Sequence, residues 1–268
     1  MPRNTFDEAV SRSGRIVAQM LPRDRDEATR QAEELPLRRD MVTLLSYVRD
    51  NKVIGTQSTG NLPLKAVHEV TARFVHPPKL EEKIGAHIYR VRSEEDVWQV
   101  FYLHVLADVG GLVDAGRARR WRLKRLGGKF LAADPLPQVL FLLSTWWYRV
   151  NWLIAYPFEG MGDSLPPSLS SLTLMYLRRL PVTKRIAADT FADHLIEAAG
   201  LTWTAPDPDV GRMALRGSVR RMMLYVLRDF GIVTLEHRNK PLGRGSIREL
   251  AAFRMTPFGR PLLKALEM

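Results

Sequence analysis

Two stretches of this chain, about 130 residues apart, follow the same residue pattern. WRLKRLGGKFL occupies residues 121–131, and FRMTPFGRPLL occupies residues 253–263. Each stretch begins with an aromatic residue and an arginine, has a glycine at its seventh position, and ends in apolar residues. Internal similarity of this kind indicates repeated structural units. The sequence therefore predicts two halves of similar fold.

A second match supports the repeat. HVLADVGGLV (104–113) and YVLRDFGIV (225–233) both place an aspartate and then a glycine where a predicted helix ends before a strand. Each half is then expected to run as helix, short strand, helix, long link, helix and hairpin. In this alignment Gly127 and Gly259 occupy equivalent positions after the two hairpins.

Periodicity and capping signals predict the elements of the first half. These are one or two amphipathic helices over Thr5–Glu34 broken near Pro22, a helix over Asp40–Asp50, an extended piece over Ile54–Ser58, a helix within 59–74 capped by Asn61, a long connection over 75–93, a helix from Ser93 to Gly110, and a hairpin with its turn at Ala115–Gly116.

The second half is predicted in the same way. Its expected elements are a helix over Ser168–Leu180, an extended piece over Pro181–Lys184, a helix over Arg185–Ala199 closed by Gly200, a connection over 201–216, a helix over Gly217–Phe230, strands at 232–237 and 247–256, and a closing helix over Pro257–Leu266.

Between the halves lies an apolar stretch, Pro135–Phe158, which we expect to form one long helix. It carries Trp146, Trp147 and Trp152, which predict either a helix buried between the two halves or a seam between two copies of the chain. Arg149 and Asn151 near its centre oppose a membrane span, because charge is costly in lipid. The expected segments are 1–39 (an N-terminal helical extension), 40–134, 135–167 and 168–268.

This order of elements resembles the winged-helix superfamily, taken twice. The resemblance covers about residues 40–134 and 168–268, and WRLKRLGGKFL is similar to the exit from a winged-helix hairpin. Both links between helices are longer than a tight helix-turn-helix requires. The resemblance implies a mainly helical fold with small β-hairpins, in which two tandem winged-helix-like domains follow the N-terminal extension. In that fold the helix before each hairpin is usually the recognition helix, and the hairpin is the wing.

Charge is concentrated in the two similar regions. Residues 51–134 hold 14 basic and 9 acidic residues, residues 168–268 hold 16 and 9, and residues 1–50 are balanced. Such an excess predicts polyanionic partners. The chain has no cysteine, which excludes disulfides and thiolate metal sites and favours a cytoplasmic protein.

The first hairpin is strongly basic, with seven basic residues and no acid in thirteen positions. They are Arg117, Arg119, Arg120, Arg122, Lys124, Arg125 and Lys129. In a strand, Arg120, Arg122 and Lys124 would share one face, opposite Trp121 and Leu123. A basic outer face of this kind suits contact with phosphates. The alternative is an edge hairpin that uses charge to avoid aggregation.

The two candidate recognition helices differ in charge. The first, Glu94–Gly110, contains no lysine or arginine, so we expect it to pack inside the protein or to face another protein. The second carries Arg216, Arg220 and Arg221 at or near its start. Arginines in that place can contact phosphates or guanine edges. An ordinary solvated helix face is the alternative.

No catalytic constellation stands out. The six histidines lack metal-ligand spacing and no nucleophile is evident, so we expect neither an enzyme nor a cofactor or metal. The sequence favours a protein that binds nucleic acid, most simply double-stranded DNA, in bacterial transcription regulation or genome maintenance. The alternative is a winged-helix scaffold that contacts other proteins without binding DNA. A protein partner or a homodimer is compatible with either, and no membrane partner is expected.

Overall fold

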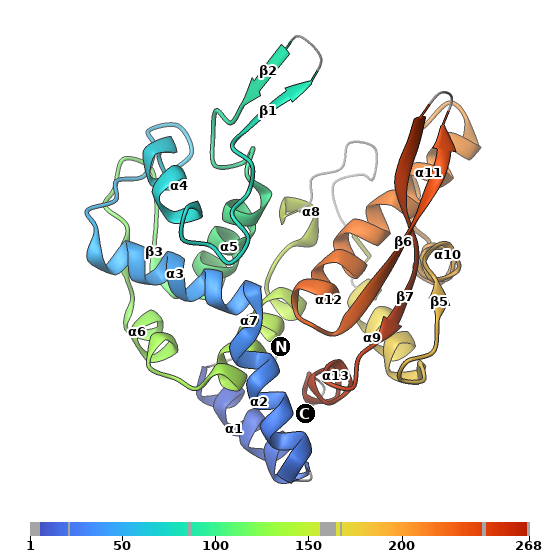
Figure 1. Ribbon diagram of the computed structural model, residues 1–268, viewed down its shortest axis with the longest axis horizontal. Helices are drawn as coiled ribbons and strands as arrows, with labels where there is room; N and C mark the ends of the chain where they lie inside the picture. Colours follow the sequence, from blue (N-terminus) through green and yellow to red (C-terminus); the bar gives the residue numbers. More distant parts are fainter. Residues whose placement is uncertain are drawn as a thin grey trace. The chain divides into compact units, whose positions relative to one another are not determined.

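The computed structural model of the chain describes residues 6–20, 22–84, 87–155, 165–166, 168–242 and 245–266. The chain divides into two compact units, Met1–Val150 (unit 1) and Asn151–Met268 (unit 2). Both are mainly helical and carry small antiparallel sheets (Figure 1). The two units are taken in turn.

Unit 1 contains helices and two short hairpins. Its elements are α1 (Phe6–Ala18), α2 (Pro22–Glu34), α3 (Pro36–Asp50), α4 (Leu64–Thr71), β1 (Glu81–Ile84), β2 (His87–Arg90), α5 (Trp98–Val109), β3 (Val113–Asp114), β4 (Arg122–Leu123), α6 (Arg125–Leu131) and α7 (Pro135–Tyr148).

Helix α7 forms the centre of unit 1. It packs against α1, α2, α3 and α5, and the side chains from Leu136 to Trp147 are all buried (Figure 1). Phe6 of α1 contacts the ring of Phe141 at 5.5 Å between centroids. A helix that is apolar on every face must be surrounded in this way. The predicted burial of Trp146 and Trp147 is therefore confirmed.

Helix α7 falls within unit 1 and packs against the N-terminal helices α1 and α2 as well as α3 and α5. One expectation for this region is wrong, because the helix ends at Tyr148, well before Phe158. Asn151 then accepts a hydrogen bond from the backbone N–H of Leu153 at 3.0 Å and starts a separate short helix, α8 (Trp152–Ala155). Trp152 is buried, and residues 156–158 lie outside the described residues.

Two predicted helix caps have other roles. Asn61 donates from its amide to Glu95 at 2.9 Å, and α4 begins only after Pro63. Ser93 precedes a turn in which Asp96 accepts from the backbone of Arg92 and Ser93, so α5 begins at Trp98. In both places the polar side chains that suggested a helix start stabilise loops instead.

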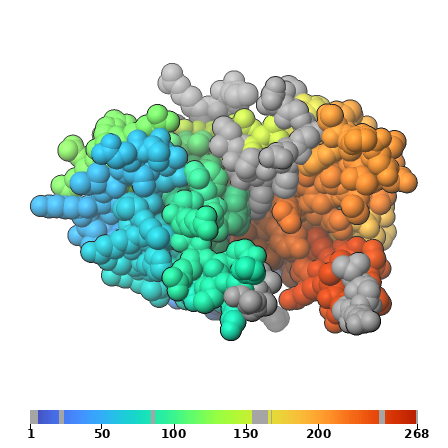
Figure 2. Space-filling view, turned by 90° about the horizontal axis from the view of Figure 1, so that it is seen from above, coloured from blue at the N-terminus to red at the C-terminus, as the bar shows by residue number. Residues whose placement is uncertain are grey.

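The first long link, 75–93, was expected to be irregular but contains the hairpin β1–β2. Its strands pair antiparallel from Glu81–Arg90 to Ile84–His87. The described residues of β2 are all exposed, including Ile88 at 52% and Tyr89 at 58%. Figure 2 shows the turquoise atoms of this hairpin on the outside of unit 1.

Unit 2 is built around one three-stranded sheet. Its elements after α8 are α9 (Leu169–Arg179), β5 (Ile186–Ala187), α10 (Ala188–Ala199), α11 (Pro208–Val219), a π-helix η1 (Arg220–Tyr225), α12 (Val226–Asp229), β6 (Val233–Leu242), β7 (Gly245–Met255) and α13 (Gly259–Ala265). The strand order is β5–β7–β6, all antiparallel.

The second long link contains the beginning of a helix. The predicted helix at Gly217 begins instead at Pro208, and α11, η1 and α12 follow one another without a break to Asp229 (Figure 1). Asp207 caps the helix by accepting from the N–H of Asp209 at 2.8 Å, and Pro208 occupies the first helical position. These are standard start signals.

The two halves repeat the same backbone contacts after α5 and α12. Gly111 and Gly231 have φ values of 72° and 67°, the left-handed conformation that favours glycine. The next residues, Leu112 and Ile232, each donate to a helix carbonyl at 2.8 Å. Their own carbonyls accept from Lys124 and Thr256, respectively, both at 2.9 Å.

Gly127 and Gly259 occupy equivalent positions, as expected. A Cβ on Gly127 would overlap the carbonyl oxygen of Leu112, and one on Gly259 would overlap that of Ile232. The strand pairs Val113–Leu123 and Val233–Met255 correspond as well. The repeat read from the sequence is thus present in the backbone.

We expect Gly127→Ala to lower the free energy of unfolding by about 1–3 kcal/mol, because the added methyl group meets backbone that cannot move away freely. Gly128→Ala is the matched control, since nothing lies within 4 Å of its Cβ and alanine favours the helix. Urea denaturation measures both. Equal effects of the two substitutions would contradict the proposed contact.

We also expect Trp146→Ala to lower the free energy of unfolding by roughly 3–5 kcal/mol, because its side chain is 1% exposed in the centre of unit 1. Tyr148→Ala at the end of the same helix should cost less, since Tyr148 is 36% exposed. Thermal and urea unfolding test the pair. An unchanged stability of the Trp146 variant would show that α7 is not core.

Candidate nucleic-acid interface

The basic residues predicted for the first hairpin lie on one continuous segment, 117–129, which we call the basic segment. Arg117, Arg119 and Arg120 lie in the loop before β4, Arg122 is in β4, Lys124 precedes α6, and Arg125 and Lys129 are in α6. All seven side chains are exposed. The predicted alternation holds from Arg120 to Lys124, because Trp121 is buried and Leu123 is partly buried between exposed basic neighbours.

The basic segment is not the regular hairpin that the sequence suggested. Strands β3 and β4 pair over two residues each, and Ala118 has a positive φ of 51°. The loop is instead held by the chain at 53–60. The N–H of Gly55 donates to the carbonyl of Arg119 at 2.9 Å, and the N–H of Trp121 donates to the carbonyl of Val53 at 2.9 Å.

Trp121 anchors this loop from inside. Its side chain is 1% exposed, and its indole N–H donates to the carbonyl oxygen of Gly60 at 2.9 Å. Glycines allow the two chain segments to approach, because a Cβ on Gly55 or Gly60 would overlap the backbone of Gly116. Gly60 also has a φ of 87°, which other residues rarely adopt.

A buried polar pair lies beside Trp121. The Glu94 carboxylate accepts from the N–H of Leu62 at 2.5 Å and contacts Nδ1 of His104 at 2.7 Å. The ring of His104 lies 4.4 Å from that of Trp121 between centroids. Hydrogen bonds satisfy this buried carboxylate, as its burial requires. The sequence did not reveal the role of Glu94, because its partners are 10 and 32 residues away.

The basic segment keeps most of its charge unpaired. Lys129 forms an ion pair with Asp7 at 3.1 Å. Arg119 donates to the carbonyl of Ala115 at 3.2 Å. Within the part of the chain that the structure describes, none of the seven except Lys129 has an acidic partner. Six exposed cations therefore stand on this backbone without an ion pair to any described acid, although Asp114 lies opposite Arg122 in the strand pair.

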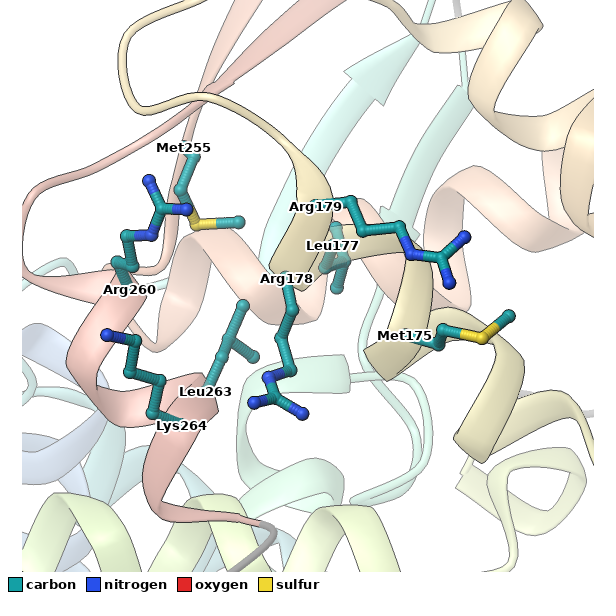
Figure 3. Close-up of a pocket in the computed structure, with 8 residues that line it drawn as sticks. All are labelled: Met175, Leu177, Arg178, Arg179, Met255, Arg260, Leu263 and Lys264. Atoms are coloured by element: carbon teal, nitrogen blue, oxygen red, sulfur yellow. The ribbon is translucent and has the colours of Figure 1, made fainter.

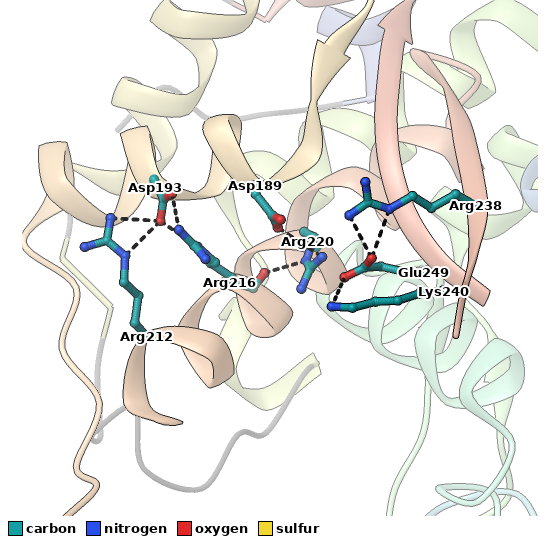
Figure 4. Close-up of polar contacts among 8 residues, drawn as sticks. All are labelled: Asp189, Asp193, Arg212, Arg216, Arg220, Arg238, Lys240 and Glu249. Atoms are coloured by element: carbon teal, nitrogen blue, oxygen red, sulfur yellow. Dashed lines mark hydrogen bonds and ion pairs between the residues drawn. The ribbon is translucent and has the colours of Figure 1, made fainter. Parts of the chain in front are cut away.

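The second predicted cluster is arranged differently. Arg216 donates to Asp193 of α10 at 2.8 and 2.5 Å, and Arg220 lies 3.1 Å from Asp189 of the same helix (Figure 4). Arg212 joins Asp193 as well. Two of the three arginines expected to reach DNA are thus occupied, because α10 presents acids four residues apart to the arginines of α11 and η1. Arg221 is exposed and has no acidic partner among the described residues.

These pairs are charge-assisted hydrogen bonds. The bond from Arg216, together with that from Arg212, lowers the pKa of Asp193 below its ordinary value, although partial burial opposes the shift. The same contact with Asp193 raises the pKa of Arg216. The α10–α11 surface is therefore largely neutralised by its own residues.

The long hairpin β6–β7 is also paired. Arg238 and Lys240 contact Glu249 at 3.0 and 3.7 Å (Figure 4), and their charges, with the Arg238 hydrogen bond as the largest cause, lower the pKa of Glu249. Arg185 and Arg254 both form ion pairs with Glu236 of β6. The basic excess of unit 2 is thus offset at close range along this hairpin.

The remaining expectations for the site concern helix α5, metal binding and membrane spans. Helix α5, which lacks basic residues, buries Val100, Leu103 and Leu106 inside unit 1. No cluster of His, Asp or Glu suited to a metal ion occurs among the described residues. No helix within them is long and apolar enough to cross a lipid bilayer.

The pairs of Asp193 make a prediction about pH. Because its pKa is lower in the folded protein than in the unfolded chain, the carboxylate stabilises the fold above its ordinary pKa of about 3.9 and loses that effect as the pH falls further. Asp193→Asn should lower the free energy of unfolding at pH 7 and flatten its decline between about pH 4 and pH 2.

Urea denaturation at several pH values measures this effect. Glu197→Gln is the control, because Glu197 is 68% exposed and its carboxylate pairs with Arg212 alone among the described residues. A decline with acid that is as steep in the Asp193 variant as in the parent protein would contradict the assignment.

Comparison with known proteins adds no relative. No protein-family model matches the chain, and neither a curated protein nor a solved structure is significantly similar to it. Its function is therefore argued from its own residues.

Proposed function

We propose that this protein binds double-stranded DNA through the basic segment of unit 1, mainly by contact with phosphates. One observation carries the proposal: six exposed cations that form no ion pair with the described acids stand on a backbone fixed by Trp121. A solvated hairpin needs few charges to remain soluble. In unit 2, by contrast, Arg185, Arg216 and Arg238 are paired with acids. An unpaired cluster favours a polyanion as its partner.

The order of elements supports a tandem winged-helix interpretation of the two halves. Unit 2 runs α9, β5, α10, the helix α11–α12, β6, β7 and α13, with β7 in the middle of the sheet. Unit 1 runs in a similar order from α3 to α6, with Ile54 bridging Arg120 in place of a full first strand and with the additional hairpin β1–β2 between α4 and α5. In this interpretation the basic segment is the wing of the first domain and α11–α12 is the recognition helix of the second.

The basic segment and the helix α11–α12 differ in how many unpaired arginines they offer, so they have different roles in the proposed binding. Phosphate contacts provide affinity and position, while base contacts provide sequence preference. The first wing has free cations for the first task. The second helix has Arg221 available, while Arg216 and Arg220 are bound to α10. We therefore propose binding with weak sequence preference, in transcription regulation or genome maintenance.

The proposal predicts a strong dependence on salt. If about four cations of the basic segment neutralise phosphates, they contribute about −3.6 to the slope of log K against log salt. Changing Arg117, Arg119, Arg120 and Arg122 together to alanine should weaken binding to every duplex alike and flatten the slope by about that amount. Fluorescence anisotropy with random duplexes at several salt concentrations measures both.

The control variant removes the same charge from elsewhere in unit 1. Arg15, Arg25, Lys65 and Lys79 are exposed and lie outside the basic segment. Changing these four to alanine should alter the slope far less. If both variants flatten it equally, the binding is general attraction by net charge. If the parent protein shows no salt-sensitive duplex binding, the DNA proposal is wrong.

A second candidate is a scaffold that contacts other proteins. Two observations favour it. The paired surface of α10 and α11 presents little net charge to DNA. Ile88 and Tyr89 are exposed on the β1–β2 hairpin. Exposed apolar side chains on a protruding element suit contact with protein. The titration above separates the candidates, because a scaffold of this kind would leave duplex DNA unbound.

A further inference from the structure

Unit 2 contains a pocket that the DNA proposal does not use. It has a volume of about 350 Å³ and is lined by residues from the end of α9, the end of β7 and α13 (Figure 3). This size falls at the lower end of the range for small-molecule sites. The whole lining belongs to unit 2.

The floor of the pocket is apolar and firmly packed. Leu177, Met255 and Leu263 are at most 2% exposed, although each borders the pocket. They come from three different elements, α9, β7 and α13, and α9 packs on α13. These side chains form the packed layer beneath the pocket, and the apolar surface that a ligand can reach comes from Met175, which is 44% exposed, and from the alkyl chains of the rim residues.

The rim is basic and contains no acid. Arg179, Arg260 and Lys264 are exposed, and no ion pair joins any of them to an acid among the described residues. Arg178 also lines the pocket and makes another contact in the chain. Figure 3 shows Leu263 between the side chains of Lys264 and Arg178, so charge and apolar surface alternate there.

Helix polarity does not account for this rim. Arg179 and Lys264 lie in the last turns of α9 and α13, where a positive charge is favourable. Arg260 lies in the first turn of α13, where a positive charge is unfavourable. Elsewhere in unit 2, Arg212, Arg216 and Arg254 are paired with acids. The pocket thus collects cations that the fold itself does not neutralise.

We propose that this pocket binds a small organic anion with an apolar body, such as a medium-chain carboxylate or an alkyl phosphate. The apolar part lies on Met175 and the alkyl chains of the rim, above Leu177, Met255 and Leu263, and the anionic group lies beside Arg260 and Lys264. Inorganic phosphate would use only the charges of the rim, and an uncharged alcohol would use only the apolar surface. Binding should therefore need both parts of the ligand.

The test uses the full chain labelled with [13C]methyl-methionine and four probes: octanoate, octyl phosphate, 1-octanol and inorganic phosphate. Octanoate or octyl phosphate should shift the Met255 methyl signal saturably, with a Kd of about 1 mM or below. The signal of Met41, buried in unit 1, should not move. Octanol and inorganic phosphate should each bind at least about tenfold more weakly.

A paired set of variants identifies the rim. Arg260→Gln with Lys264→Gln should weaken octanoate binding at least about tenfold, because both charges meet the carboxylate. Arg221→Gln with Arg248→Gln removes two exposed charges of unit 2 outside the pocket and should leave binding unchanged. All four residues are exposed, so neither double variant should disturb the fold. The shift of the Met255 signal in the parent protein tests binding without any substitution.

Several results would overturn the proposal. These are no saturable shift of Met255 with either organic anion, equal binding of octanol or of inorganic phosphate, or equal loss in the two double variants. The outcome does not depend on DNA binding, since no duplex is present. Preference for octanoate over octyl phosphate, or the reverse, would identify which anion the rim accepts and supports the proposal in either case.

Discussion

The hydrogen bond from the indole of Trp121 to the carbonyl of Gly60 holds unit 1 together around its most highly charged segment. Holding six cations close together opposes folding because like charges repel. The repulsion within each exposed pair costs only about 1 kcal/mol or less. Burial of a tryptophan removes roughly 200 Å² from water, which corresponds to about 5 kcal/mol. Five adjacent pairs would together cost up to about 5 kcal/mol, so the apolar anchor offsets a repulsion of similar size. The close approach of Gly55 and Gly60 to Gly116 makes this anchor possible.

The two halves share a backbone pattern but treat their charges in opposite ways. In unit 1 the basic segment has one ion pair among the described residues, between Lys129 and Asp7. In unit 2 the acids of α10 are spaced one helical turn apart and face arginines on the next helix. One repeat thus keeps its cations available, and the other uses them to join its helices. A chain with a net charge of +11 can in this way carry one surface of concentrated charge and one that is nearly balanced.

Local signals in the sequence predicted what local contacts determine. The helix ends beside Gly111 and Gly231 and the burial of Trp146 and Trp147 in an apolar helix were predicted correctly, because their causes lie within a few residues. The pairing of Arg216 with Asp193 was missed, since helix periodicity does not say which helix lies opposite. Asp207 and Pro208 did carry a start signal for α11, but two prolines close together suggested a loop. The pocket joins three elements of unit 2, so no single stretch of sequence indicated it.

The repeated glycine contacts also bear on the order in which each unit folds. The helix end at Gly111, the hairpin and the contact of Gly127 with Leu112 all fall within about 20 residues, whereas the bond from Trp121 to Gly60 closes a separation of 61. Contacts between near neighbours form early, and contacts that close long loops form late. We therefore expect the loop over residues 117–121, which the bond to Gly60 holds, to reach its final form late in the folding of unit 1. It is also among the first to lose that form when the protein opens locally, so its cations are correctly placed only when folding of unit 1 is complete.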